Sequence, residues 1–122
     1  MNTSTRAVAL AGALLSLSAV ILAAMGGHLI DMKGLQSIWE TASVIHMFNA
    51  VALIALAALL AHMNSRLLIW GAWVIVLGTV AFCGSIYFHV VSGQLIPNVA
   101  PAGGMLMMAG WILVVVALIR RS

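Results

Sequence analysis

Long intervals without a charged residue are the feature that most constrains this chain. Its 122 residues include only seven charged side chains. The uncharged intervals cover residues 7–30, 41–65 and 67–119. A helix that crosses a hydrocarbon core of about 30 Å needs about 20 apolar residues, so the first two intervals each allow one crossing and the third allows two. A soluble domain is excluded, because roughly a quarter of its residues would be charged.

The third interval contains one strong break, at residues 92–98. This segment, SGQLIPN, combines serine, glycine, proline and asparagine, which favour turns. We therefore expect an all-α, integral membrane four-helix bundle that forms a single transmembrane domain over residues 1–122. Its helices are expected at about 7–27, 42–62, 67–90 and 102–119.

The first apolar segment has an alternative interpretation, a secretion signal that is cleaved. Arg6 precedes the segment, and the small residues Ala23 and Ala24 lie near its end. However, its uncharged stretch is longer than the roughly 7–15 residues of a signal core, and three similar segments follow it. We therefore expect a membrane helix.

The basic residues predict the orientation in the membrane, because lysine and arginine in short loops stay on the cytoplasmic side. With four crossings, one side receives Arg6, Arg66, Arg120 and Arg121, and only Lys33 lies opposite. We expect a multi-pass protein with both termini in the cytoplasm. The net charge of +3 then reflects topology. No nucleic-acid partner is expected, because no basic face with interleaved aromatic residues is present.

The connection at residues 28–41 is the longer of the two on the outer side. Its apolar residues, among them Ile38 and Trp39, are spaced so as to predict an amphipathic helix that lies in the membrane interface. Trp39 is expected to anchor the outer surface, and Trp70 and Trp73 the inner one, since tryptophan is enriched at both interfaces.

Small residues predict how the helices pack. Gly71, Gly78 and Ser85 recur at intervals of seven, and Gly103 and Gly110 have the same spacing. A seven-residue interval keeps one seam of a helix facing its neighbour, and small residues let membrane helices approach closely. We expect a left-handed bundle with these seams, which describe packing rather than function.

Polar side chains at membrane depth are the candidates for function, because they are costly there and often functional. His46 and Asn49 lie three residues apart on one face of the second helix. Thr79, Cys83 and Tyr87 form a polar stripe on the third helix at a similar depth. We therefore expect a cluster of polar groups in the outer half of the bundle.

Two more histidines and several methionines are expected in this outer half. His28 ends the first helix and His89 ends the third. Thioethers with imidazole suit copper(I), and imidazole alone suits zinc, copper or haem iron. The same residues are also typical of packing, since methionine fills irregular gaps in apolar cores. No CxxC, HxxxH or HExxH spacing is present, so we assign no metal site and leave any cofactor unknown.

Nothing in the sequence specifies a catalytic centre. Cys83 is the only cysteine, which excludes an internal disulfide, and in apolar surroundings its thiol is expected to be unreactive. No serine has the glycine-rich turn of a nucleophile elbow. Trp111 lies near the middle of the fourth helix, where its indole N–H needs a partner. We expect a protein that is not an enzyme.

Four motifs, in order along the chain, resemble one family. They are AAMGGH at 23–28, WETASVIHMFNAVAL at 39–53, GTVAFCGSIYF at 78–88 and APAGGMLMMAGW at 100–111. They are similar to motifs of the domain of unknown function 423 family, small bacterial inner-membrane proteins related to eukaryotic transmembrane protein 256. The resemblance covers nearly the whole chain and implies a four-helix protein of the bacterial inner membrane, without an established activity. Family members usually have histidine at the position of Asn49, so no ligand role is carried over to that residue.

Glycines at the start of the fourth helix complete a candidate site. Gly103 and Gly104 would let another helix or a ligand head group approach the amides there. Apposed to His28, Tyr87 and His89, they would outline a shallow pocket that faces outward.

Two functions follow for this membrane protein. The first is a non-enzymatic accessory or structural subunit, whose partners are the lipid bilayer and a larger membrane complex, for example a respiratory one, or further copies of itself. The second is a binding protein for a metal, haem, quinone or lipid head group. Its candidate residues are His28, His46, Tyr87, His89, Gly103 and Gly104.

Overall fold

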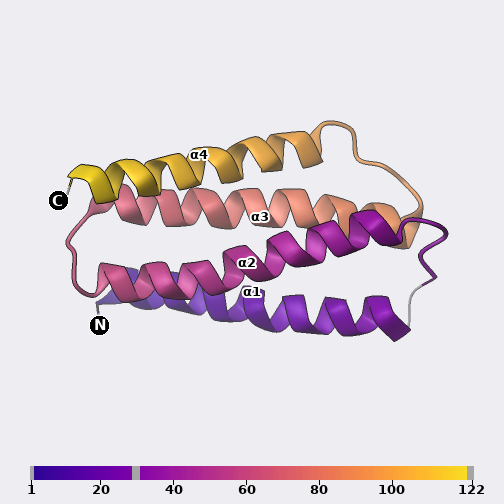
Figure 1. Ribbon diagram of the computed structural model, residues 1–122, viewed down its shortest axis with the longest axis horizontal. Helices are drawn as coiled ribbons and strands as arrows, with labels where there is room; N and C mark the ends of the chain where they lie inside the picture. The colour runs from indigo at the N-terminus through magenta and orange to yellow at the C-terminus, as the bar shows by residue number, and fades with distance from the viewer. Residues whose placement is uncertain (1, 29–30, 121–122) are drawn as a thin grey trace.

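Four long helices run along the longest axis of the molecule (Figure 1). The computed structural model describes residues 2–28 and 31–120. Each helix is long and apolar enough to cross a membrane, which confirms the expected all-α, four-helix architecture. The helices are α1 (Thr3–His28), α2 (Gln36–Leu60), α3 (Arg66–Ser92) and α4 (Val99–Arg120).

Local hydrogen bonds set where the helices begin and end. Asn2 Oδ1 accepts a hydrogen bond from the Thr5 N–H at 2.8 Å. Ser65 Oγ accepts one from the Leu68 N–H at 3.2 Å. Each bond satisfies a first-turn donor that has no partner within its helix. Gly93 ends α3 in the left-handed conformation, with φ of 77°, which glycine adopts without steric cost.

The second helix begins earlier than the charge pattern predicts. α2 starts at Gln36, six residues before the expected start at 42. The interfacial helix expected within 28–41 is therefore wrong, because residues 36–41 are the first turns of α2. Glu40 is exposed on α2, and a charged side chain that reaches water leaves the backbone hydrogen bonds of its helix intact. The other three helices extend past their expected bounds by at most four residues.

Trp39 lies inside the bundle, so the prediction that it anchors the outer surface is wrong. Only 4% of its surface is exposed. Its ring lies 4.7 Å from the ring of Tyr87, between centroids, at an interplanar angle of 59°. The early start of α2 is the cause, because it places Trp39 on a helix that packs against α3. Trp70 and Trp73 are exposed near the start of α3, as interfacial anchors would be.

Glycines bring α3 and α4 together. A Cβ at Gly78 would lie 2.6 Å from the Met107 nitrogen and 2.8 Å from the Gly103 oxygen. A Cβ at Gly71 would lie 3.0 Å from the Gly110 oxygen. Such close approach of two backbones is open only to glycine. The seams expected from the seven-residue spacing of these four glycines are confirmed.

The helices form two hairpins that meet through α2 and α3. α1 packs on α2, and α4 packs on α3 (Figure 1). Gly12 lies where α1 meets α2, since a Cβ there would be 3.0 Å from the Ala50 oxygen. Both chain ends and the connection between α2 and α3 lie at one end of the bundle. This end carries Arg6, Arg66 and Arg120, while Arg121 lies outside the described residues.

Candidate functional site

His46 on α2 and Tyr87 on α3 form the centre of the candidate site. Their Nδ1 and Oη atoms lie 3.0 Å apart, and the side chains are 4% and 8% exposed. His46 Nε2 lies 3.1 Å from Ser18 Oγ on α1. The imidazole therefore contacts polar groups from two other helices, and both of its ring nitrogens have a partner.

The hydrogen bonds of Ser18 favour one position for the proton of His46. Ser18 Oγ donates its only proton to the Leu15 carbonyl at 2.9 Å, so it accepts from His46. His46 Nε2 is then the donor, and in a neutral ring Nδ1 is the acceptor. In this tautomer Tyr87 donates its hydroxyl proton to His46 Nδ1. The neutral imidazole is suited to a dry site, where a charged ring would be costly.

Asn49 lies on α2 one turn from His46, and its side chain bonds to residues of both α3 and α4. Its Nδ2 group donates to Thr79 Oγ1 at 2.9 Å and to Met107 Sδ at 3.1 Å. The Trp111 indole donates to Asn49 Oδ1 at 3.1 Å. Trp111 thus has the partner that its depth requires. The pairs His46–Tyr87 and Asn49–Thr79 show that the polar residues of α2 and α3 cluster at a similar depth, as expected.

The structure brings together two of the six predicted site residues, His46 and Tyr87. The His28 side chain is exposed at the end of α1, and that of His89 is half-buried near the end of α3. Neither side chain makes a hydrogen bond or ring contact with another residue of 2–28 or 31–120. The candidate site is therefore an interior cluster, and the outer histidines do not contact it.

The glycine pair of α4 serves helix packing. A Cβ at Gly103 would collide with the backbone nitrogen of Phe82 on α3, so this face of Gly103 is closed to a ligand. A Cβ at Gly104 would lie 3.8 Å from Phe82 Cδ1, an ordinary contact. Of the two partners expected for these glycines, a helix or a ligand, the structure shows a helix at Gly103.

A small cavity lies beside the His46–Tyr87 pair, between α1 and α3. Its volume is about 170 Å³. α1 and α3 are close to each other over only a short stretch, which leaves this space between them. It is lined by Leu15, Ser18, Leu22, His46, Thr79, Val80, Cys83, Gly84 and Tyr87. Cys83 is otherwise engaged, since its thiol donates to the Ala42 carbonyl at 3.3 Å.

A larger cavity, of about 350 Å³, lies between the end of α1 and the start of α2. Its wall includes Trp39 and Ser43 from α2 and Gly26 from α1, with Gln36 and Glu40 among the polar residues around it. Trp39 Nε1 is buried and has no hydrogen-bond partner within the described parts of the chain. Ser43 Oγ, in the wall of the same cavity, is likewise buried and without a partner among the described residues. An unpaired buried polar group costs about 1–3 kcal/mol, so this cavity has two unsatisfied groups in its wall.

Two residues of the site are not apparent from the sequence alone. Ser18 is one of several small polar residues in α1, and its link to His46 depends on how α1 packs against α2. The burial of Trp39 is not apparent because the charge of the next residue, Glu40, suggests an interfacial segment instead of a membrane helix. No group of three histidine, cysteine, aspartate or glutamate side chains in residues 2–28 and 31–120 could hold a metal ion.

Comparison with known proteins identifies the family. The family model described as "Protein of unknown function (DUF423)" matches residues 22–104. A UPF0382 membrane protein of Staphylococcus epidermidis is 31% identical over 113 residues, which cover 89% of this chain and 92% of that protein. The UPF0382 inner membrane protein YgdD of Escherichia coli is 35% identical over 108 residues, which cover 83% of this chain and 80% of YgdD.

No solved structure matches the chain. The four helices of membrane-spanning length, the family match and the membrane proteins among the relatives agree with one another. This chain is a multi-pass membrane protein and belongs to the DUF423 family.

Proposed function

We propose that this protein is a non-enzymatic accessory subunit that packs against a larger assembly in the bacterial inner membrane. The proposal includes a single transmembrane domain with both termini in the cytoplasm, as the distribution of arginine predicts. The observation that carries it is the face of α1 that points away from the other three helices. This face exposes four large apolar side chains at intervals of four, three and four residues: Leu10, Leu14, Leu17 and Ile21.

The spacing of this α1 face is that of a helix-packing seam. Alternating intervals of three and four place side chains along one stripe, which in a coiled coil faces a neighbouring helix. The helices of the chain itself leave the stripe open, because all four side chains are exposed. An exposed stripe of similar spacing also occurs on α4, but α1 is the least buried of the four helices and so offers the most surface to a partner. We therefore assign the stripe to a transmembrane helix of another subunit.

The buried polar groups support a structural role. His46, Tyr87 and Asn49 are each bonded to side chains of other helices. Interhelical hydrogen bonds of this kind fix the register of membrane helices, where association has no hydrophobic driving force. The polar groups at membrane depth are thus used for holding the bundle together.

Native mass spectrometry of the protein, extracted gently from its own membrane, tests this proposal. We expect the mass of a different protein subunit in addition to that of the chain. Replacing Leu14 and Leu17 by tryptophan should remove the added mass, because the larger rings disrupt the stripe. Ile112→Trp on α4 is the matched control, since Ile112 is similarly exposed. A bare chain, added copies of the same chain, or equal loss in both variants would contradict an accessory subunit that docks through α1.

A second candidate function, the binding of a small ligand, is favoured by the unpaired indole of Trp39. The group is a donor, so it calls for a ligand with an acceptor, such as the carbonyl oxygen of a quinone or of a lipid ester. The cavity of about 350 Å³ beside it is within the usual size range for small-molecule sites. Tyr87 does not line this cavity, but it contacts both Trp39, which does, and His46, which keeps Tyr87 and His46 among the candidates for binding.

Two glycines provide a sharp test of this second candidate. A Cβ at Gly26 would overlap the Trp39 indole, whereas one at Gly84 on α3, which does not line this cavity, would meet nothing within 4 Å. A small mass that co-purifies with the wild-type chain should be lost in Gly26→Ala and kept in Gly84→Ala. If both variants retain that mass, it does not bind beside Trp39, and the absence of any such mass from the wild type would exclude this function.

A further inference from the structure

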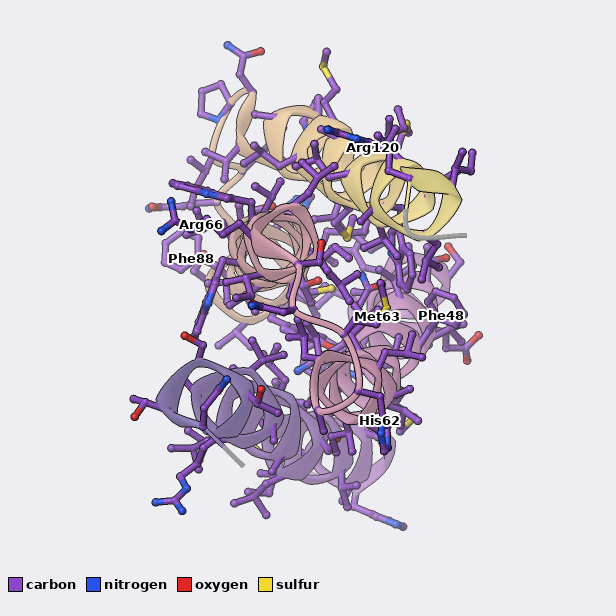
Figure 2. All side chains as sticks on the ribbon, turned by 90° about the vertical axis from the view of Figure 1, so that its left-hand side faces the viewer. Phe48, His62, Met63, Arg66, Phe88 and Arg120 are labelled. Carbon is purple, nitrogen blue, oxygen red and sulfur yellow. The ribbon has the colours of Figure 1, made fainter. Side chains whose placement is uncertain are left out.

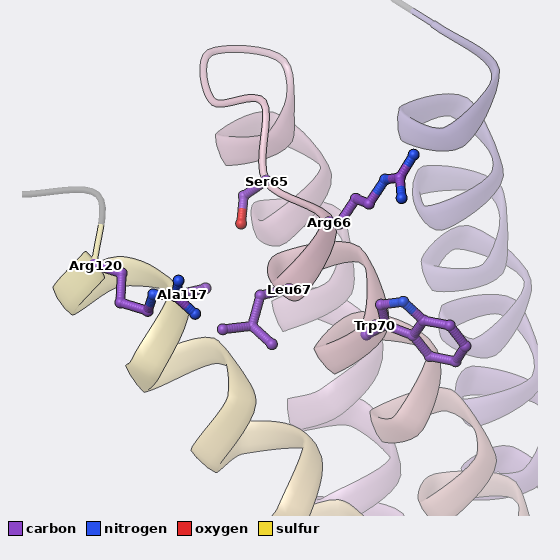
Figure 3. A pocket seen from close by; sticks show the side chains of 6 residues that line it. All are labelled: Ser65, Arg66, Leu67, Trp70, Ala117 and Arg120. Atoms are coloured by element: carbon purple, nitrogen blue, oxygen red, sulfur yellow. The ribbon is translucent and has the colours of Figure 1, made fainter.

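The end of the bundle that carries both termini contains a second type of site, independent of the proposed function. A cavity of about 440 Å³ lies between the start of α3 and the end of α4. Figure 3 shows the six residues that line it, Ser65, Arg66, Leu67, Trp70, Ala117 and Arg120. Arginine and tryptophan are therefore combined with apolar side chains at a place where the helices end.

The two arginines lie on either side of Leu67. The Arg120 side chain turns toward Ala117 and the start of α3, while Arg66 and Trp70 extend on the far side of Leu67 (Figure 3). Figure 2, which looks onto this end, shows both arginines on the α3 and α4 side of the bundle, away from His62. The two positive charges therefore lie on opposite sides of an apolar strip and do not form a single cluster.

The surface continues along α3. A neighbouring hollow of about 430 Å³ is lined by Arg66, Ile69, Trp70 and Trp73. Residues at intervals of four and three share one helix face, so Arg66, Trp70 and Trp73 form one stripe. Trp70 is 66% exposed and Trp73 is 36% exposed. Indole rings at such positions lie at the level of lipid head groups and direct their polar edge toward them.

No carboxylate of the described chain compensates these arginines. The only acidic residues, Asp31 and Glu40, lie in the connection between α1 and α2 and in the first turns of α2, at the opposite end. Arg66 and Arg120 make no ion pair within residues 2–28 and 31–120. A guanidinium presents a planar fork of donors that matches the oxygens of a phosphate.

We propose that this end binds an anionic phospholipid, with Arg66 and Arg120 flanking its head group and an acyl chain lying along Leu67 and Trp70. The uncompensated charge selects a negative head group over a zwitterionic one. The apolar strip between the arginines favours a lipid over a free phosphate ion, because only the lipid has a chain to cover it.

Lipid titration of the full chain in detergent, followed by native mass spectrometry, tests the assignment. The wild type should retain phosphatidylglycerol in preference to phosphatidylcholine. Arg66→Gln and Arg120→Gln should each weaken phosphatidylglycerol binding about fivefold, since one basic residue near an anionic lipid surface contributes about 1 kcal/mol. Both arginines are exposed, so thermal unfolding without added lipid should be unchanged in these variants.

Arg6→Gln is the matched control, because it removes a positive charge from the same end without altering either cavity lining. It should retain wild-type affinity. Equal loss in Arg6→Gln, or equal retention of the two lipids, would overturn the site in favour of general attraction by the positive end. Glycerol 3-phosphate in excess should fail to displace the lipid, and displacement would assign the arginines to a soluble phosphate instead.

Discussion

Asn49 and Trp111 are joined by a hydrogen bond of 3.1 Å from the indole nitrogen to the amide oxygen, although the backbones of their two helices do not approach each other closely. The bond reaches from α2 to α4, and the Asn49 amide nitrogen donates to Thr79 on α3. One side chain therefore ties three helices together at membrane depth.

Replacing Asn49 by leucine should destabilise the bundle. The change leaves the Trp111 indole without its acceptor and removes a donor from Thr79 and Met107, at a cost of about 1–2 kcal/mol in the free energy of unfolding. Reversible unfolding in detergent measures this loss. Val51→Leu, at an exposed position of the same helix, is expected to be neutral. Equal stability of the two variants would show that the Asn49 bonds contribute nothing.

The His46–Tyr87 contact should show a favourable coupling energy. Tyr87→Phe removes the hydroxyl and retains the ring, and His46→Phe removes the acceptor. In a double-mutant cycle the effects of the two changes should be non-additive by about 0.6 kcal/mol, the average for interhelical hydrogen bonds in membranes, and by no more than about 1.7 kcal/mol. Additive effects on the free energy of unfolding would mean that the 3.0 Å contact carries no net interaction.

The protonation of His46 can be read directly by nitrogen NMR. Because Ser18 donates to Leu15, the neutral ring should carry its proton on Nε2 and leave Nδ1 as the acceptor of the Tyr87 hydroxyl. The imidazole nitrogen shifts of His46 in the detergent-solubilised protein should show this tautomer. A proton on Nδ1 would require Tyr87 to accept and Ser18 to donate to the ring, and would reverse the direction of both bonds.

Gly78→Ala should be strongly destabilising, by about 1–3 kcal/mol, because overpacking forces the backbones apart. The added Cβ would collide with the backbone of Met107 and Gly103 on α4. Gly84→Ala on the same helix is the control, since a Cβ there meets nothing within 4 Å and alanine is the better helix former. The thermal unfolding temperatures of both variants distinguish a packing effect at Gly78 from a general effect of replacing glycine by alanine in this helix.

The orientation of the chain is testable with single cysteines in a Cys83→Ala background. Asn64 lies in the connection between α2 and α3, and Gln94 in that between α3 and α4. If the termini are cytoplasmic, an impermeant thiol reagent added outside the inner membrane should label Gln94→Cys and leave Asn64→Cys unlabelled. The opposite labelling pattern would invert the topology.

The sequence predicts the number of helices, their approximate bounds and the glycine seams, because these depend on the charges and small residues along one helix. It also predicts that polar residues of α2 and α3 cluster at a similar depth. It does not predict the burial of Trp39, because Glu40 interrupts the apolar pattern while the helix continues. It does not reveal Ser18 as the partner of His46 either, since that contact depends on the rotation of α1 against α2.

The two kinds of helix contact differ in where they occur. The glycine contacts lie within the hairpins, between α1 and α2 and between α3 and α4, whereas Asn49 and Tyr87 bond from one hairpin to the other. We therefore expect assembly in two stages, in which each hairpin closes by close backbone contact and the polar groups then favour one alignment of the two hairpins. A chain cut in the connection after Met63 should accordingly reassemble from its halves on co-expression, and Asn49→Leu should weaken that reassembly without unfolding either half.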